Sequence, residues 1–160
     1  MKRSHKMGKM HEAVMLNDLT AVKILAEQDE PVDELDREGR TPLFYAIQNG
    51  SLPLAAELIS LGANVNAQDN NLEGPLHFAA RAYNLEATKL LIDHGAEVDL
   101  KDRQGNTPLS NAVFESRGRE PVIKYLLQSG ADRSATNNHG VSPEELANSI
   151  ANYDISKFFT

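Results

Sequence analysis

The chain has 160 residues, a formal net charge of −7 and no cysteine. Without thiols, a disulfide framework and a thiolate metal site are excluded, and a reducing compartment fits. No apolar run reaches the roughly 18 residues of a membrane-spanning helix, and no apolar signal segment follows the basic start. The acidic surplus argues against a nucleic-acid footprint, which needs a basic face. We therefore expect a soluble, cytoplasmic protein that spans no membrane and binds no nucleic acid.

Charge is distributed unevenly along the chain. Lys2, Arg3, Lys6 and Lys9 lie in the first nine residues, which leaves 12 basic against 23 acidic residues for the rest. We expect residues 1–6 to be a basic flexible arm. A solvated, frayed terminus is the favoured interpretation, and a short address or phosphate-seeking arm is the alternative. The acidic run 29–36 likewise fits a solvated loop better than a docking patch for a basic partner.

A period of 33 residues runs through the chain. Thr41-Pro42-Leu43 returns 66 residues later as Thr107-Pro108-Leu109, and a degraded copy, Gly74-Pro75-Leu76, lies halfway between them. Self-similarity at this spacing indicates stacked units that cannot bury their apolar faces alone. Keeping the last copy in phase requires a two-residue insertion around Ser116-Arg117.

Each unit begins with a turn and a first helix. The segments 10–14 and 18–25 match the helical part of the unit, so the array starts near residue 7. Asp36, Asp69 and Asp102 each precede a turn, where an aspartate can accept hydrogen bonds from its own backbone. Thr41 and Thr107 are expected to cap helices that begin with proline.

A second helix completes each unit. Asp18, Ser51 and Asn84 occupy equivalent positions and are expected N-caps. Gly62, Gly95 and Gly130 follow the second helices, where a left-handed residue is favoured. The predicted unit is therefore helix, short loop, helix and a turned extended segment.

These motifs closely resemble the ankyrin repeat, whose signature is Thr-Pro-Leu-His-x-Ala. The resemblance includes the Ala79-Ala80 pair and the closing segments Gly62-Ala63-Asn64-Val65-Asn66 and Gly95-Ala96-Glu97-Val98-Asp99. It implies an all-α solenoid of stacked helix-turn-helix units with short β-hairpin fingers. We expect one array over residues 7–160, with units of about 7–36, 37–69, 70–102, 103–137 and 138–160.

Catalytic chemistry is not indicated. The five histidines are scattered rather than paired at metal-ligand spacing, and no phosphate-binding glycine motif or activated nucleophile is present. We expect no enzyme activity, no cofactor and no metal. The resemblance instead assigns the rings of His11 and His77 to hydrogen bonds between repeats.

The resemblance places partner contacts on the finger tips and on the exposed edge of each first helix. Arg81, Tyr83 and Phe114 are the strongest candidates, because aromatic and arginine side chains carry most interface energy. Replacing Arg81 with alanine is expected to spare folding and to weaken binding. The full set of candidates is Arg37, Glu38, Arg40, Gln48, Asn49, Asn70, Asn71, Leu72, Glu73, Arg81, Tyr83, Arg103, Gln104, Asn106, Phe114, Glu115, Asn138 and His139.

Several residues depart from the repeat pattern. Leu72 replaces the turn glycine and Gly74 the capping threonine, which fits either local decay of a repeat or an apolar tip kept for a partner. Arg133 replaces the usual valine of the closing segment. Phe158 and Phe159 are expected to pack onto the final helix, and an exposed tail is the alternative.

Two functions remain open. The leading hypothesis is a non-catalytic protein-protein interaction module, monomeric when free, that masks or inhibits a partner protein such as a basic enzyme or toxin. This role is similar to that of an inhibitor or immunity protein. The alternative is a scaffold or targeting adaptor that uses the basic N-terminal arm.

Overall fold

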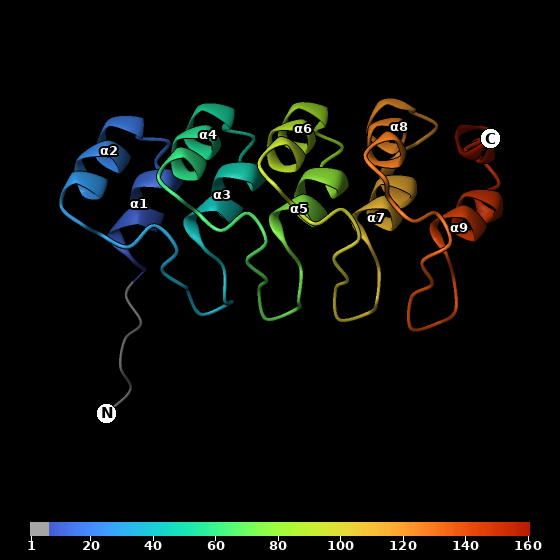
Figure 1. Ribbon diagram of the computed structural model, residues 1–160, viewed down its shortest axis with the longest axis horizontal. Helices are drawn as coiled ribbons and strands as arrows, with labels where there is room; N and C mark the ends of the chain where they lie inside the picture. The colour runs from blue at the N-terminus through green and yellow to red at the C-terminus, as the bar shows by residue number, and fades with distance from the viewer. Residues whose placement is uncertain (1–6) are drawn as a thin grey trace.

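The computed structural model describes residues 7–160, so the predicted basic arm 1–6 lies outside the described residues. Its helices form two rows along one elongated stack (Figure 1). The inner row contains α1 (Lys9–Met15), α3 (Pro42–Gln48), α5 (Pro75–Arg81), α7 (Pro108–Glu115) and α9 (Pro143–Ser149). The outer row contains α2 (Leu19–Glu27), α4 (Leu52–Ser60), α6 (Leu85–Asp93) and α8 (Pro121–Gln128). The predicted all-α solenoid is confirmed, whereas the division into units stays a prediction.

The apolar core is one continuous strip between the two rows. Leu58, Leu91 and Leu126 hold equivalent positions in α4, α6 and α8, and each is fully buried. All of them belong to the same core cluster as the inner-row residues Leu43, Leu76 and Leu109. Each repeat therefore completes its core with its neighbours, as a solenoid requires.

Helix caps agree with the sequence at some positions and differ at others. Asp18, Asn84 and Thr107 each accept a backbone N–H two or three residues into the following helix, as expected. The prediction for Thr41 and Ser51 was wrong. Ser51 donates its hydroxyl to Asn17 Oδ1 at 2.7 Å instead, and Thr41 Oγ1 is buried without a partner among the described residues.

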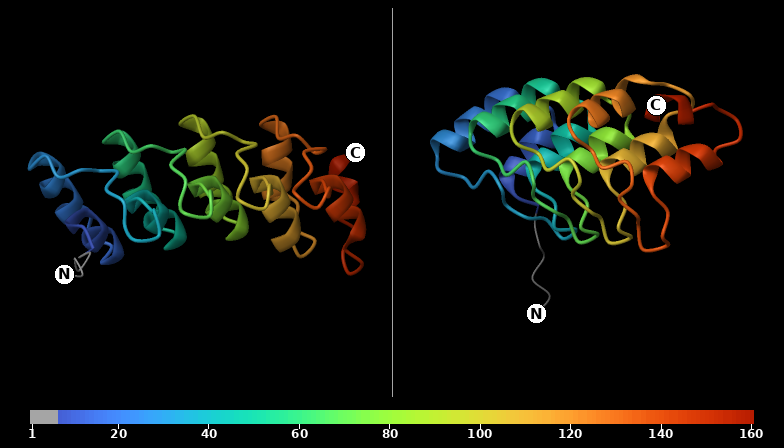
Figure 2. Two further views of the ribbon diagram at one scale, coloured as in Figure 1. Left: turned by 90° about the horizontal axis from the view of Figure 1, so that it is seen from below. Right: turned by 45° about the vertical axis from the view of Figure 1, so that its right-hand side comes forward.

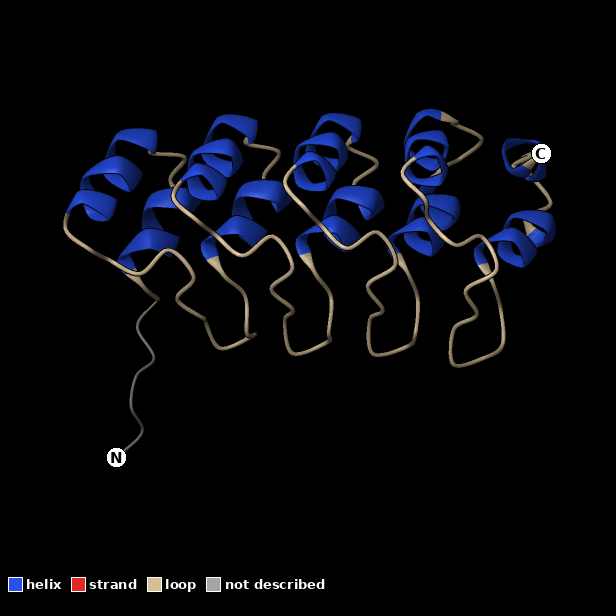
Figure 3. Cartoon of the chain, viewed as in Figure 1, coloured by secondary structure: helices blue, strands red, loops and turns tan. Residues whose placement is uncertain are grey.

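Fingers project from the inner-row side of the stack (Figures 2 and 3). In the first finger, Asp36 N–H donates to the carbonyl of Arg40 at 3.0 Å, and Gly39 turns the chain with φ of 76°. Between residues 7 and 160 the structure contains no strand, so the predicted hairpins are closed turns without a β ladder of their own. The reason is length, since each turn leaves only one pair of flanking residues to hydrogen-bond.

The C-terminal end of the stack is closed by a short 3-10 helix, η1 (Ser156–Phe159), which takes the place of an outer helix. Phe159 is buried, as expected, and Phe158 packs partly against the core. Arg133 pairs with Glu144 on α9 and donates to the carbonyl of Phe159, so it ties this end together. Among residues 7–160, no helix is both long and apolar enough to cross a membrane.

Candidate partner-binding surface

The aspartate at the start of each finger shapes the finger from within. Asp36, Asp69 and Asp102 each accept the backbone N–H groups two and four residues later, at 2.8 to 3.1 Å. Asn137 does the same in the last finger. The predicted aspartate turns are confirmed, and these hydrogen bonds fix the finger backbone.

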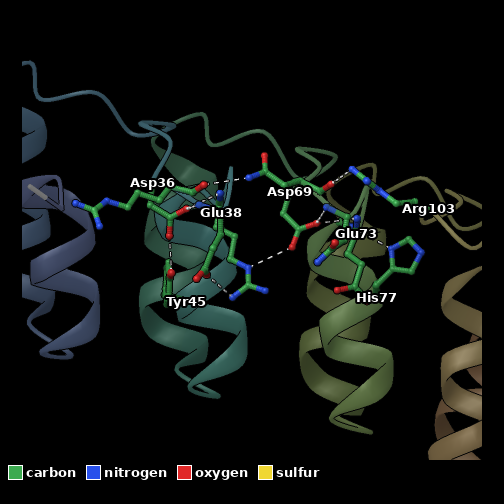
Figure 4. A network of polar contacts seen from close by, with 12 residues as sticks. Asp36, Glu38, Tyr45, Asp69, Glu73, His77 and Arg103 are labelled. Atoms are coloured by element: carbon green, nitrogen blue, oxygen red, sulfur yellow. Dashed lines mark hydrogen bonds and ion pairs between the residues drawn. The ribbon is translucent and has the colours of Figure 1, made fainter. Parts of the chain in front are cut away.

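Successive fingers are also hydrogen-bonded to one another (Figure 4). The N–H groups of Asn70, Arg103 and Asn138 donate to the carbonyls of Glu38, Asn71 and Gln104, each at 2.8 Å. The predicted finger residues therefore lie in one connected row rather than on independent loops. Such a row is already ordered before a partner arrives, which lowers the entropic cost of binding.

The turn position of each finger packs against the following finger. A Cβ at Gly39 would lie 2.7 Å from Asn70 Oδ1, and a Cβ at Gly105 would lie 2.7 Å from Asn138 Oδ1. In the second finger the turn residue is Leu72, with φ of 59°, and the residue that follows at the asparagine position is Arg103. Glycine is thus paired with asparagine twice, and leucine with arginine once.

Arg40 is a structural bridge rather than a free finger-tip residue. Its Nε donates to Asp69 Oδ2 at 3.2 Å, its Nη1 to Glu38 Oε2 at 3.0 Å, and its guanidinium lies 5.1 Å from the centre of the Phe78 ring. Burial disfavours the charged guanidinium, but these carboxylates outweigh it and raise the pKa of Arg40. Arg40 therefore joins the first finger to the second.

Glu73 and Arg81 correct the prediction for the second repeat. Glu73 is only 8% exposed, and its carboxylate pairs with the guanidinium of Arg81, which also lies 5.4 Å from the centre of the Phe78 ring. Removing Arg81 would leave a buried carboxylate unpaired, which is strongly destabilising. We therefore expect Arg81→Ala to destabilise the fold, in place of the sequence-based expectation that it spares folding.

Tyr83 is likewise held by the protein itself. It occupies the left-handed conformation, with φ of 53°, and its hydroxyl donates to the carbonyl of Arg119. The guanidinium of Arg119 stacks 4.1 Å from the ring centre. Burial raises the pKa of Tyr83. The half-buried ring therefore anchors the inserted loop and leaves little surface for a partner.

Two titratable groups beside the fingers are tuned by their surroundings. Burial, and next the hydrogen bond to Asp36, raise the pKa of Tyr45 to about 12. Burial also opposes ionisation of Asp36, but hydrogen bonds from Tyr45, Arg40 and Glu38 prevail and lower its pKa. At neutral pH, Tyr45 is therefore a hydrogen-bond donor to a charged Asp36.

His77 links the second and third repeats, as the resemblance implied. Its Nδ1 accepts from the N–H of Gly74 at 3.0 Å, and its Nε2 donates to the carbonyl of Asn106 at 3.2 Å. Burial lowers the pKa of His77, so the ring is neutral. His11 makes the corresponding contact with the carbonyl of Arg40 at 2.9 Å.

One position near the end of each inner helix forms a row across the stack. Met15, Gln48, Arg81 and Phe114 hold this position in α1, α3, α5 and α7, and all four are exposed. Phe114 is 69% exposed, which is unusual for a side chain of its size. Gln48 and Asn49 lie exposed at the end of α3.

Beside Phe114 the surface is hollowed between α5, α7 and α9. We call this hollow of about 340 Å³ the concave groove. Four predicted residues, Arg81, Asn106, Phe114 and Glu115, are brought together there. The sequence analysis missed the other residues that line it, namely Ser110, Asn111, Asn137 and Leu146. Ser110 and Asn111 lie in α7, Leu146 lies in α9, and Asn137 starts the last finger, so no single sequence position marks all four. Asn111 Nδ2 is buried there without a partner among residues 7–160.

A second hollow lies beside the first finger. It measures about 390 Å³ and is lined by three acidic side chains and one basic side chain together with apolar and aromatic ones, namely Glu34, Asp36, Glu38, Arg37, Met7, Leu35 and Tyr45. Leu35 is exposed. The acidic run 29–36 therefore presents both charge and apolar surface rather than a uniformly polar loop.

The remaining predicted residues lie along the finger row. Leu72 is 46% exposed at the tip of the second finger. His139 is exposed on the last finger, where its N–H donates to Asn137. The other exposed candidates in this row are Arg37, Glu38, Asn70, Asn71, Arg103, Gln104 and Asn138.

Comparison with known proteins decides the family. The family model described as ankyrin repeats, three copies, matches residues 6–69 and 61–137. The chain belongs to the ankyrin-repeat family. Ankyrin repeats are protein-protein interaction modules, so the surface described above is that of a binding protein.

Curated ankyrin-repeat relatives differ widely in what they are. The transient receptor potential cation channel subfamily A member 1 of Homo sapiens is 32% identical over 115 residues, which cover 71% of this chain and 10% of that protein. The B-cell lymphoma 3 protein homolog of Mus musculus is 34% identical over 136 residues, which cover 84% of this chain and 28% of that protein. The probable 26S proteasome regulatory subunit p28 of Saccharomyces cerevisiae is 31% identical over 152 residues, which cover 93% of this chain and 65% of that protein. The chain spans less than two thirds of each of these relatives.

Proposed function

We propose that this ankyrin-repeat chain is a non-catalytic, cytoplasmic binding protein that occupies and masks a partner protein, in the manner of an inhibitor or immunity protein. The concave groove carries the proposal, because it sets an exposed aromatic side chain, Phe114, beside a polar wall of Asn106, Asn111 and Asn137. An aromatic anchor next to hydrogen-bonding groups is the arrangement of interface hot spots. The name of the yeast relative, a regulatory subunit, supports a regulatory rather than a catalytic role.

The chemistry of the partner follows from charge. The chain carries a net charge of −7, and the hollow beside the first finger is lined by three carboxylates, Glu34, Asp36 and Glu38, against the single cation Arg37. Long-range attraction by such a surface accelerates encounter with a basic protein and is screened by salt. A basic enzyme or toxin is therefore the proposed partner, and the free chain is proposed to be monomeric.

Affinity capture with matched variants tests the proposal. The full chain, Phe114→Ala and the control Ile24→Ala serve as baits, because Ile24 is an exposed apolar residue of the outer row. Phe114→Ala is expected to lose the captured partner, whereas Ile24→Ala retains it. Addition of the full chain should then reduce the partner's activity in proportion to complex formation. Equal capture by both variants contradicts the site, and an unchanged partner activity contradicts the inhibitor role.

The adaptor alternative gains one specific observation. Lys9 begins α1 and pairs with Glu30, so it belongs to the folded body, and Lys2, Arg3 and Lys6 are the cations that precede that body. Deleting residues 1–6 leaves α1 intact. An adaptor that relies on the arm loses its cellular location on this deletion, whereas an inhibitor keeps its affinity.

A further inference from the structure

The two-residue insertion after α7 builds a surface that the other repeats lack. Three residues separate α1 from α2, α3 from α4 and α5 from α6, but five residues, Ser116 to Glu120, separate α7 from α8. The segment that follows α9 lies beside this loop, at the end of the stack away from the fingers (Figure 2). The ring of Tyr153 covers the loop backbone, since a Cβ at Gly118 would lie 2.9 Å from Tyr153 Cδ1.

Between the two segments is a small apolar pocket, which we call the C-terminal hollow. It measures about 200 Å³ and is lined by Phe114, Arg117, Ile150, Asn152, Tyr153 and Ile155. Phe114 forms the ridge between this hollow and the concave groove, because it lines both. A volume of this size is below the range of small-molecule sites, about 300–1,000 Å³, and suits a single side chain.

Arg117 supplies the only charge among the residues that line the C-terminal hollow. Its side chain is exposed and makes no ion pair or hydrogen bond with any residue between 7 and 160. The backbone holds it there in the left-handed conformation, with φ of 49°. A non-glycine residue in this conformation costs about 1–2 kcal/mol, so surrounding contacts must impose it.

Those contacts come from Arg119, two residues further on. Its Nε donates to the carbonyl of Ser116 at 2.9 Å, its Nη2 donates to the carbonyl of Glu115 at 3.1 Å, and its guanidinium stacks on Tyr83. The loop is therefore fixed from both sides. A fixed loop presents Arg117 to a partner at a reduced entropic cost.

We propose that the C-terminal hollow binds one apolar side chain of a partner protein whose neighbouring residue carries a carboxylate that pairs with Arg117. Charge complementarity selects this occupant, because an unpaired guanidinium at an apolar rim favours an anion and penalises a cation. The inference rests on the proposed protein-binding function and extends it to a second contact on the far side of Phe114.

A library of displayed linear heptapeptides, selected against the immobilised full chain, tests the proposal. Enriched peptides are expected to carry Phe, Leu or Trp next to Asp or Glu. Their affinity should fall about tenfold or more for Tyr153→Ala and for Arg117→Glu, as hot-spot contacts do. Replacing the peptide carboxylate with lysine should restore binding to Arg117→Glu. The control Lys23→Glu makes the same change of charge on α2 in the outer row, where affinity should stay within about twofold because the site is distant.

The outcomes separate this inference from the proposed function. Leu146 lines the concave groove and not the C-terminal hollow, whereas the reverse holds for Tyr153. If peptide affinity falls for Leu146→Ala but not for Tyr153→Ala or Arg117→Glu, the peptides bind in the concave groove. That result contradicts binding in the C-terminal hollow and is consistent with the proposed function. Peptides that respond to none of the three, or a selection that enriches none, contradict both. Thermal unfolding of each variant checks that the fold is retained.

Discussion

The second and third fingers reach the same shape with different chemistry. The third finger turns at Gly105, with φ of 79°, and Thr107 caps the helix that follows. The second turns at Leu72, with φ of 59°, and its helix begins at Pro75 after Gly74, which has no side chain to accept a helix N–H and whose own N–H donates to His77 Nδ1. Both fingers begin with an aspartate that accepts the same two backbone N–H groups.

The difference shows which contacts define a finger and which can vary. The aspartate bonds and the bonds to the neighbouring finger occur in both, so they maintain the backbone. The turn residue and the cap differ between the two fingers. At the turn, Arg103 donates to a carbonyl of the preceding finger, that of Asn70, as the asparagines Asn70 and Asn138 do in the other fingers, and at the cap His77 still holds the N–H of Gly74. A change of the turn residue is therefore expected to come with a change of the residue that it meets on the next finger.

The largest expected effect concerns the core, where the two repeats should not differ. Leu91→Ala and Leu126→Ala should each lower the free energy of unfolding by about 2–5 kcal/mol, because both side chains are fully buried at equivalent positions. Urea denaturation of both variants measures the loss. A negligible effect at one of the two positions would show that the two repeats do not contribute equally to the apolar core strip.

Replacing the buried histidine of the second repeat should cost less. His77→Ala leaves the N–H of Gly74 and the carbonyl of Asn106 without their partner, at about 3 kcal/mol in total. Ser110→Ala, at the equivalent position in the third repeat, should cost less than about 1 kcal/mol, because Ser110 Oγ makes only a long contact of 3.4 Å.

The pH dependence checks the cause of the His77 effect. The pKa of His77 is lowered in the folded protein, so the unfolded chain binds the extra proton once the pH falls below about 6.5. The stability that His77 adds is thus complete above this pH and is lost as the pH falls. The difference between the original chain and His77→Ala should narrow from pH 7 to pH 5, and a constant difference would contradict a neutral buried ring.

Exchanging the turn residues should change the free energy of unfolding in opposite directions in the two fingers. Leu72→Gly relieves a left-handed leucine and should raise the free energy of unfolding by about 1 kcal/mol. Gly105→Leu introduces the same strain, about 1–2 kcal/mol, and also places a Cβ against Asn138. Thermal and urea denaturation give both values, and a destabilising Leu72→Gly would refute the strain at this turn.

A double-mutant cycle tests the coupling between neighbouring fingers. Arg103→Asn alone sets an asparagine against the Cβ of Leu72, by analogy with the 2.7 Å approach at Gly39 and Gly105, and should destabilise the chain. Combined with Leu72→Gly it should recover, with a coupling free energy of about 1 kcal/mol. Strict additivity of the two single changes would mean that the pairs are unrelated.

The smallest effect lies in the first finger and appears in acid. Asp36→Asn keeps the acceptor for the two N–H groups, as Asn137 does naturally in the last finger. The lowered pKa of Asp36 adds stability above about pH 4, and this contribution is lost as the pH falls through the folded value. The original chain should therefore lose more stability than Asp36→Asn between pH 5 and pH 3, as measured by urea denaturation.

The sequence predicted the array because period, proline and glycine act locally. A proline at the start of an inner helix or a glycine after an outer helix has the same consequence in every copy. The hairpins and two caps were not predictable in this way. Ser51 finds Asn17 in the preceding repeat, and the absence of a β ladder depends on the number of paired residues.

The surface was predicted less completely, because partner contacts and internal contacts use the same residue types. Phe114, Arg81 and Tyr83 looked equivalent in sequence, yet Phe114 is exposed, Arg81 neutralises a buried Glu73 and Tyr83 supports the inserted loop. Only the three-dimensional packing distinguishes an arginine that is available from one that is engaged. The insertion itself was visible in the sequence, whereas the hollow beside it was not, since the residues after α9 complete that hollow.

The matching of turn residue to neighbouring finger also fixes the order of the repeats. A tandem duplication of residues 70–102 would place Leu72 of the first copy against the asparagine of the second copy that corresponds to Asn70, a combination found nowhere in residues 7–160. Removing the same segment would instead bring Gly39 beside Arg103. Because Gly39 has no side chain, the arginine meets no Cβ at this position. Deleting this repeat should therefore strain the finger row less than duplicating it, although the repeats have the same fold.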